Sequence, residues 1–135
     1  TGMSSLKEVD RAIQILKGGA DFTLLHCNST YPSPDNELNL RVIETLSDRY
    51  HCNVGYSGHE TDLEAPLVAI TLGARIIERH ITLSHDMWGT DHKSSLEVHA
   101  MDMLRKRCSK VLPMLGSSNK IVTDGEKEIR KKLRG

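Results

Sequence analysis

Short apolar runs alternate with helix-patterned segments along this chain, and no other feature of the sequence limits its fold as strongly. The chain opens with a helical pattern, in which apolar residues recur on one face at Leu6, Val9, Ile13 and Leu16. Three units follow, each with an apolar run, a polar loop and a helical pattern, and the runs cover 22–27, 53–57 and 75–83. Strands that alternate with helices predict a parallel sheet with helices outside it, so the expected class is α/β.

Capping patterns indicate where the helices begin and end. Ser5 and Glu8 have the spacing of a capping box, as do Ser94 and Glu97, so a helix is expected to begin at each pair. Glycines are expected to end the helices, at Gly18–Gly19, Gly73 and Gly116. The chain then becomes polar and basic, and we interpret 117–135 as a linker.

Two architectures fit this order of elements, an open doubly wound sheet and a (βα)₈ barrel. A barrel of about 250 residues uses roughly 31 for each unit, so this chain would fill about half of one. In both architectures the loops that follow the strands carry function. The polar, histidine-bearing loops of this chain do follow its predicted strands.

Composition argues against several classes of protein. Lysine plus arginine (18) equals aspartate plus glutamate (18), so nothing in the charge suggests a nucleic-acid or anionic-membrane partner. No apolar stretch is long enough to span a bilayer, and no signal peptide opens the sequence. The three cysteines show neither zinc-module spacing nor a disulfide pattern. We therefore expect a soluble protein in a reducing, cytoplasmic compartment.

Two histidines are candidate metal ligands. His59 and His80 each follow an apolar run where that run ends, which would direct both side chains to one mouth of the sheet. A neutral imidazole is a good ligand for manganese, iron or zinc. The alternative is that His80 is a core histidine bonded to backbone and that His59 caps a loop.

Two carboxylates accompany these histidines. Glu78 lies two residues before His80, so both side chains should point to the same face of the strand. The alternative for Glu78 is a salt bridge to Arg75 or Arg79. Asp91 lies in a polar loop, where an ordinary turn aspartate is the alternative interpretation.

Hydroxyl and amide groups gather at the same expected mouth. Ser57 follows a glycine on the second run, where a chain can approach a ligand closely. Ser29, Asn28 and Tyr31 follow the first run. Such groups suit phosphate or sugar hydroxyls, although ordinary loop hydrogen bonding is the alternative for all four.

Several long motifs, standing in order, resemble the sialic acid synthase (N-acetylneuraminate synthase) family. They are TGM at 1–3, LLHCNSTYP at 24–32, VGYSGHE at 54–60, LGARIIERHITL at 72–83 and GTDHKSSLE at 89–97. The resemblance implies that 1–116 are the second half of a TIM barrel and that 117–135 lead to an antifreeze-like domain. The lysines expected to hold phosphoenolpyruvate would then belong to the first half.

The family condenses phosphoenolpyruvate with N-acetylmannosamine, or with a related sugar or its 6-phosphate, to a nonulosonic acid and phosphate. The resemblance implies that His59 and His80 bind a divalent metal, usually Mn²⁺ or Mg²⁺. Glu78 then matches the acid beside the metal site, and is the expected catalytic residue. Ser57 matches a phosphoenolpyruvate contact.

The sugar would be bound by the loops, according to the same resemblance. Tyr31 and Asp91 match sugar contacts. Ser29 matches a small polar substrate-binding position, with Asn28 beside it. Gly58 stands where many relatives carry aspartate, and we assign it no role.

Three functional interpretations follow. The first is a fragment of such a synthase, expected to be inactive alone and to pair with a second copy as a homodimer through its open sheet edges. The second is a non-catalytic half-barrel binding or regulatory module. The third is another phosphoenolpyruvate-condensing synthase with a different aldehyde acceptor.

Overall fold

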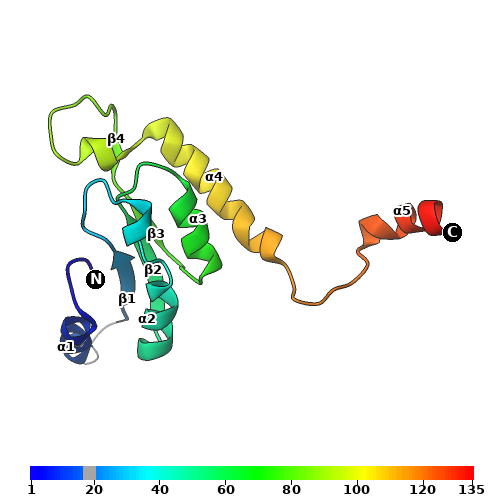
Figure 1. Cartoon of the computed structure of the whole chain (residues 1–135), viewed down its shortest axis with the longest axis horizontal. Coiled ribbons are helices and arrows are strands. Elements are labelled where there is room, and N and C mark those ends of the chain that lie inside the picture. Colours follow the sequence, from blue (N-terminus) through cyan, green and yellow to red (C-terminus); the bar gives the residue numbers. More distant parts are fainter. Residues whose placement is uncertain (17–20) are drawn as a thin grey trace.

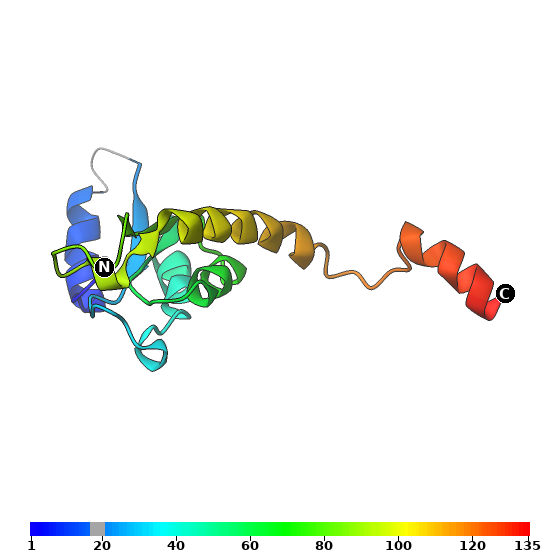
Figure 2. The same ribbon diagram turned by 90° about the horizontal axis from the view of Figure 1, so that it is seen from above.

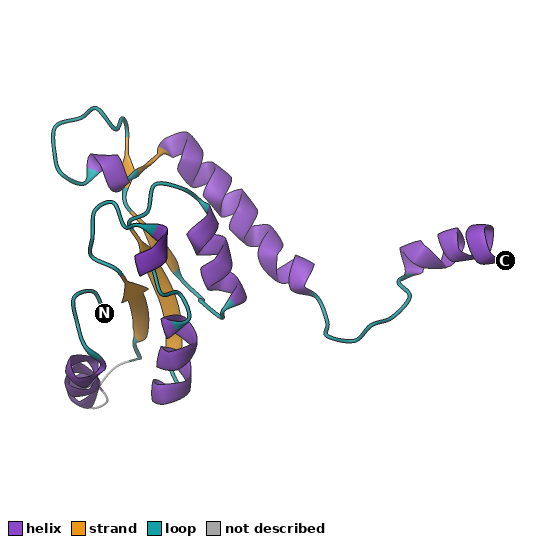
Figure 3. Ribbon diagram, in the orientation of Figure 1, coloured by secondary structure: helices purple, strands orange, loops and turns teal. Residues whose placement is uncertain are grey.

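The computed structural model describes residues 1–16 and 21–135, so the predicted glycine stop at Gly18–Gly19 lies outside the described residues. The helices are α1 (Leu6–Leu16), α2 (Val42–Tyr50), α3 (Glu64–Thr71), α4 (Val98–Leu115) and α5 (Asp124–Arg134) (Figure 1). The strands are β1 (Thr23–Cys27), β2 (Asn53–Gly58), β3 (Ile77–Arg79), β4 (Ile81–Thr82) and β5 (Leu96–Glu97) (Figure 3). Two short 3₁₀ turns, η1 (Asp35–Glu37) and η2 (His92–Ser94), lie in the loops.

The sheet is parallel, as the alternation of strands and helices predicts. Its order is β1-β2-β3, and both pairs of neighbours run in the same direction. The register aligns Cys27 with Ser57 and Ser57 with Glu78, so these three residues form one row across the strands. The α/β class is therefore confirmed.

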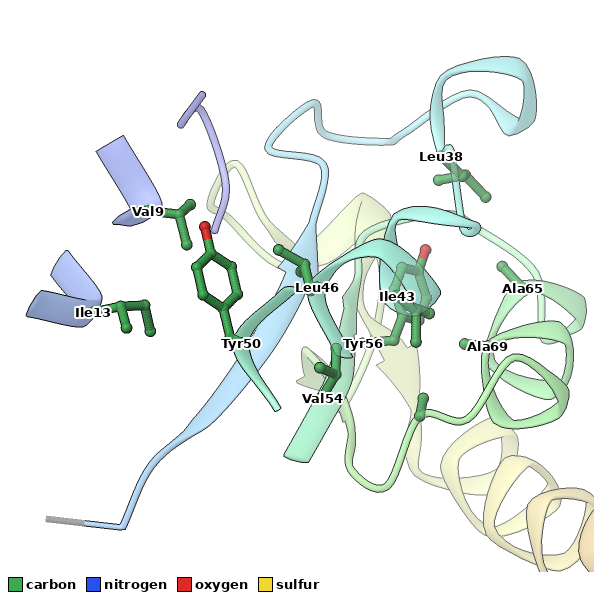
Figure 4. Close-up of a cluster of buried hydrophobic side chains, with 11 residues drawn as sticks. Val9, Ile13, Leu38, Ile43, Leu46, Tyr50, Val54, Tyr56, Ala65 and Ala69 are labelled. Carbon is green, nitrogen blue, oxygen red and sulfur yellow. The ribbon is translucent and has the colours of Figure 1, made fainter. Parts of the chain in front are cut away.

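The apolar core lies between this sheet and the helices. Alternate residues of β2, Val54 and Tyr56, are buried against α2 and α3 (Figure 4). From α2, Ile43 and Leu46 point into this core and have at most 1% of their surface exposed. Because side chains alternate along a strand, the row of Cys27, Ser57 and Glu78 belongs to the opposite, polar face.

The predicted third strand is interrupted. Instead of one strand over 75–83, the chain forms β3 and then β4, with His80 between them. The amide of Leu96 donates a hydrogen bond to the carbonyl of His80 (2.8 Å), and β4 pairs in parallel with β5. This second pairing draws the chain away from the first sheet directly after Arg79.

One prediction about the later part of the chain is wrong, and one helix there was not predicted. The spacing of Ser94 and Glu97 predicts a capping box, but Ser94 lies in η2 and α4 begins only at Val98, after Leu96 has paired with β4. The linker interpretation of 117–135 missed α5, which begins with a capping box between Thr123 and Glu126. Figure 2 shows α5 beyond an extended segment that follows α4.

The described helices include no candidate for a membrane-spanning helix. None of them combines the length and the apolar composition that crossing a bilayer requires.

Shortening Ile43 should destabilise the fold. Ile43 has no exposed surface, so Ile43→Ala leaves a cavity and is expected to lower the free energy of unfolding by about 2–5 kcal/mol. The matched substitution Ile15→Ala removes a side chain that is 81% exposed and should change it by less than about 0.5 kcal/mol. Urea unfolding followed by circular dichroism measures both, and equal effects would contradict the assignment of the core.

Candidate active site

The ends of β2 and β3 bring two histidines together. Gly58 and Arg79 are the last aligned pair of these parallel strands, and His59 and His80 directly follow them. The centroids of the two imidazole rings are 5.1 Å apart and their planes are inclined by 65°. The predicted convergence of the two rings at the carboxyl end of adjacent strands is confirmed.

The loop after β1 holds His59 in place. The Nδ1 atom of His59 lies 2.8 Å from the carbonyl oxygen of Asn28, and the Tyr31 ring centroid lies 4.1 Å from that of His59. A carbonyl oxygen only accepts hydrogen bonds, so Nδ1 is the donor, and in the neutral tautomer Nε2 is the nitrogen with a free lone pair. His59 is 3% exposed, and its free nitrogen is therefore held in one orientation.

His80 is more open to solvent than His59. Its side chain is 37% exposed, and Nδ1 lies 3.8 Å from a carboxylate oxygen of Asp91. Tyr31 also approaches this ring edge-on, with a centroid distance of 5.8 Å. Loops after all three strands of the sheet thus meet around the histidine pair.

Ser57 and Glu78 form a hydrogen-bonded pair on the polar face of the sheet. The Ser57 hydroxyl donates to Oε1 of Glu78 over 2.8 Å. The proposed salt bridge between Glu78 and Arg79 does not form, because neighbours along a strand point to opposite faces and Arg79 pairs with Glu60. Glu78 therefore keeps its carboxylate on the same face as Ser57.

Ser29 and Asn28 lie beside His59 but make different contacts. The Ser29 hydroxyl lies 3.7 Å from the Cys27 sulfur, which in turn lies 3.9 Å from Nδ1 of His59. The Asn28 amide donates to the carbonyl of Glu37 (3.1 Å), and its side-chain oxygen accepts from the amide of Thr30 (2.8 Å). Asn28 thus uses its side chain within the loop and its carbonyl to hold His59.

Tyr31 presents a protonated hydroxyl to an acidic neighbourhood. Burial raises the pKa of the Tyr31 phenol, and the nearby acidic groups of Cys27, Asp91 and Glu78 raise it further. The phenol therefore remains a hydrogen-bond donor at neutral pH. A sugar hydroxyl or a carboxylate is a suitable acceptor for it.

His26 lies outside this cluster. Its Nε2 lies 2.7 Å from the carbonyl oxygen of Leu38. Burial lowers the pKa of His26, so its imidazole is neutral.

A buried charged network lies behind the histidines and was missed in the sequence. Arg79 donates to a carboxylate oxygen of Glu60 over 2.6 Å, and both side chains are 1% exposed. The Tyr56 hydroxyl donates to the other oxygen of Glu60 over 2.7 Å. Burial and the Glu60 charge together raise the pKa of Tyr56 strongly, so its hydroxyl stays protonated. The available signal was that Glu60 follows His59 and Arg79 precedes His80.

The side chains around the histidines supply at most part of a metal site. Among residues 1–16 and 21–135, no group of three or more histidine, cysteine, aspartate or glutamate side chains is placed to hold an ion. Two imidazoles with a free Nε2 on His59 fit a metal that takes its remaining ligands elsewhere. The hydrogen bond from Nδ1 of His59 to a backbone carbonyl is the support that metal-bound histidines usually have.

The profile of the NeuB family matches residues 1–120. The chain belongs to the NeuB family. This match covers every residue of the histidine cluster, including the loops after β1, β2 and β3.

Relatives within the NeuB family are synthases of several nonulosonic acids. The chain is 39% identical to N,N′-diacetyllegionaminic acid synthase of Campylobacter jejuni, with 98% of the chain and 42% of that protein aligned. It is 36% identical to human N-acetylneuraminate-9-phosphate synthase, with 98% of the chain and 38% of that protein aligned. The chain thus spans less than half the length of these curated relatives.

A solved structure of a NeuB-type enzyme has the same fold. It is N-acetylneuraminic acid synthetase from Leptospira borgpetersenii in complex with citrate, with a TM-score of 0.84 and 34% identity. The alignment covers 98% of this chain and 48% of that one.

A methyl group at Gly58 should disturb the buried network. A Cβ atom there would lie 2.6 Å from a Glu60 carboxylate oxygen and 2.8 Å from the Tyr56 ring. Gly58→Ala is therefore expected to destabilise the protein by about 1–3 kcal/mol. Thermal unfolding followed by circular dichroism measures the change.

The matched control is Gly125→Ala, where a Cβ atom meets nothing within 4 Å. It lies in helix α5, where alanine is favoured over glycine by roughly 0.5–1 kcal/mol, so no loss of stability is expected. A Gly58→Ala protein as stable as the control would contradict the tight packing of Glu60.

Proposed function

We propose that this chain is part of a synthase that condenses phosphoenolpyruvate with N-acetylmannosamine, or with a related amino sugar or its 6-phosphate. The product is a sialic or other nonulosonic acid, with release of phosphate. The observation that supports this proposal best is the meeting of His59, His80 and Tyr31, with Glu78 on the same face of the sheet. The names of the relatives agree with it.

The proposal includes a divalent metal held by His59 and His80. Two nitrogen donors suit Mn²⁺ better than Mg²⁺, which prefers carboxylate, phosphate and water oxygens. When bound there, the ion would act as a Lewis acid toward the aldehyde oxygen of the sugar. Its remaining ligands would come from substrate, water or residues outside this chain.

The proposed reaction forms one carbon–carbon bond and requires proton transfer by a residue of this chain. Carbon 3 of phosphoenolpyruvate attacks the aldehyde carbon, water adds at carbon 2, and phosphate leaves by cleavage of its bond to carbon 2. The water gives up a proton and the new hydroxyl at the former aldehyde takes one. In our proposal Glu78 accepts this proton and passes it to the new hydroxyl, and the second proton of the water leaves with the phosphate as the carbonyl forms at carbon 2.

Binding of the substrates is assigned to the loops around the histidines. Ser57, beside Glu78, would contact phosphoenolpyruvate through its hydroxyl. Tyr31 and Asp91 approach His80 from different loops and would contact the sugar. Ser29 would add a further hydroxyl, and Asn28 would contribute mainly by holding His59.

We further propose that the sheet is half of a (βα)₈ barrel. Within the described residues β1 and β3 are edge strands, and the polar face carries Ser57 and Glu78 as the inside of such a barrel would. The relatives that it matches are more than twice as long. The 135 residues alone are then expected to be inactive and to pair as a homodimer through these edges, which light scattering tests.

Removing His80 should abolish catalysis without unfolding the protein. Its side chain is 37% exposed, so His80→Ala should retain the fold. A Lewis acid contributes several kcal/mol of transition-state stabilisation, so activity should fall by at least about 100-fold. The measurement is phosphate release from phosphoenolpyruvate and N-acetylmannosamine with Mn²⁺, using the full-length protein.

The exposed His99 of α4 provides the matched control, and His99→Ala should retain full activity. Dialysis against a chelator should abolish phosphate release by the unmodified protein, and added Mn²⁺ should restore this activity. A folded His80→Ala protein with full activity would contradict the metal role. Failure of all proteins to release phosphate would contradict the proposed reaction.

A further inference from the structure

The buried pair of Glu60 and Arg79 joins the two strand ends that carry the histidines. Beyond the last aligned pair of β2 and β3, the Arg79 guanidinium reaches back to the segment after β2. It donates to the Glu60 carboxylate (2.6 Å) and to the carbonyl of Asp62 (3.0 Å), and it also contacts the carbonyl of Glu60. One side chain of β3 thus binds three acceptors that follow His59.

The pair acts on the side of the sheet opposite to the imidazoles. Arg79 lies on β3 directly before His80, and neighbours along a strand point to opposite faces. Glu60 directly follows His59, and its carboxylate accepts hydrogen bonds from Tyr56 and Arg79 on the helix side. The link between residues 60 and 79 on the helix side therefore joins the two backbones directly beside His59 and His80. The contacts of His59 with Asn28 and Tyr31 orient its ring, and Tyr31 also lies edge-on against His80, but these ring contacts are not hydrogen bonds between the two strand ends.

Stability alone does not account for a charged pair in this place. Taking two charges out of water is costly, and well-packed apolar side chains of similar size often stabilise a fold as well or better. The Nε atom of Arg79 is also buried without a partner among the described residues. What an apolar pair would lose is the directed geometry of a guanidinium that binds several acceptors at once.

We propose that Glu60 and Arg79 are positioning residues that hold His59 and His80 at the spacing needed for a shared ion. The metal part of this inference rests on the proposed function. The geometric part, that the pair sets the spacing of the two rings, does not depend on it.

The main test replaces the charges with apolar groups in the full-length protein. The double variant Glu60→Met/Arg79→Met should keep its melting temperature within a few degrees of the unmodified protein, because apolar packing replaces the ion pair. Its affinity for Mn²⁺, measured by titration calorimetry, should be 10–100-fold weaker, as is typical when support of a ligand is lost. The nuclear Overhauser effect between the His59 and His80 ring protons should weaken as well.

The control is a second carboxylate–guanidinium pair far from the histidines. Arg49 binds Asp10 through two hydrogen bonds of 2.9 and 2.8 Å between α2 and α1. Asp10→Asn/Arg49→Met should leave Mn²⁺ affinity and the ring-to-ring signal unchanged. Loss of metal binding in both double variants would overturn a specific role for Glu60 and Arg79.

A second variant covers the case in which the double variant does not fold. Arg79→Lys keeps the charge but removes the fork that reaches several acceptors, and it should weaken Mn²⁺ binding several-fold in a folded protein. A folded Arg79→Lys or double variant with unchanged Mn²⁺ affinity and an unchanged ring-to-ring signal overturns the proposal. If the unmodified protein binds no Mn²⁺, the proposed metal fails, and the ring-to-ring signal still decides whether the pair positions the histidines.

Discussion

The parallel register of β2 and β3 is the constraint on which the candidate site depends. Because Ser57 aligns with Glu78 and Gly58 with Arg79, the next residues on the two strands, His59 and His80, must emerge side by side. A shift of one residue would exchange the two faces of a strand. It would place one imidazole among the apolar side chains under the helices and bring a charged neighbour to the polar face.

The two faces of the sheet differ in how fully their polar groups are hydrogen-bonded at the ends of β2 and β3. The helix side buries a full ion pair, and it meets the cost of desolvation with hydrogen bonds from Arg79 and Tyr56 to Glu60. The polar side leaves Glu78 with one hydroxyl donor and leaves His80 partly exposed. Groups on that side therefore keep lone pairs available for a ligand, whereas those on the helix side have almost none left.

Local pattern was sufficient to predict the parallel sheet and the convergence of His59 and His80, because both follow from strand periodicity and from where apolar runs end. It was insufficient for the break at His80, which depends on a hydrogen bond from Leu96, a residue distant in sequence. The partner of Arg79 was unpredictable for a similar reason, since it is set by register between strands. Helix α5 is harder to predict although its capping box is local, because its basic composition is also typical of a linker.

Two imidazoles are too few for a closed metal site, and this incompleteness agrees with catalysis better than with a structural role. Structural ions are usually enclosed by protein ligands, whereas catalytic ions keep positions open for substrate. Tyr31 remains a protonated donor and Glu78 accepts a hydrogen bond from Ser57, so groups of both kinds lie near the ends of the strands. A polar substrate with hydroxyls and a carboxylate satisfies such a surface better than an apolar ligand does. The proposed reaction therefore needs a substrate that supplies the remaining metal ligands and also binds the polar side chains around the histidines.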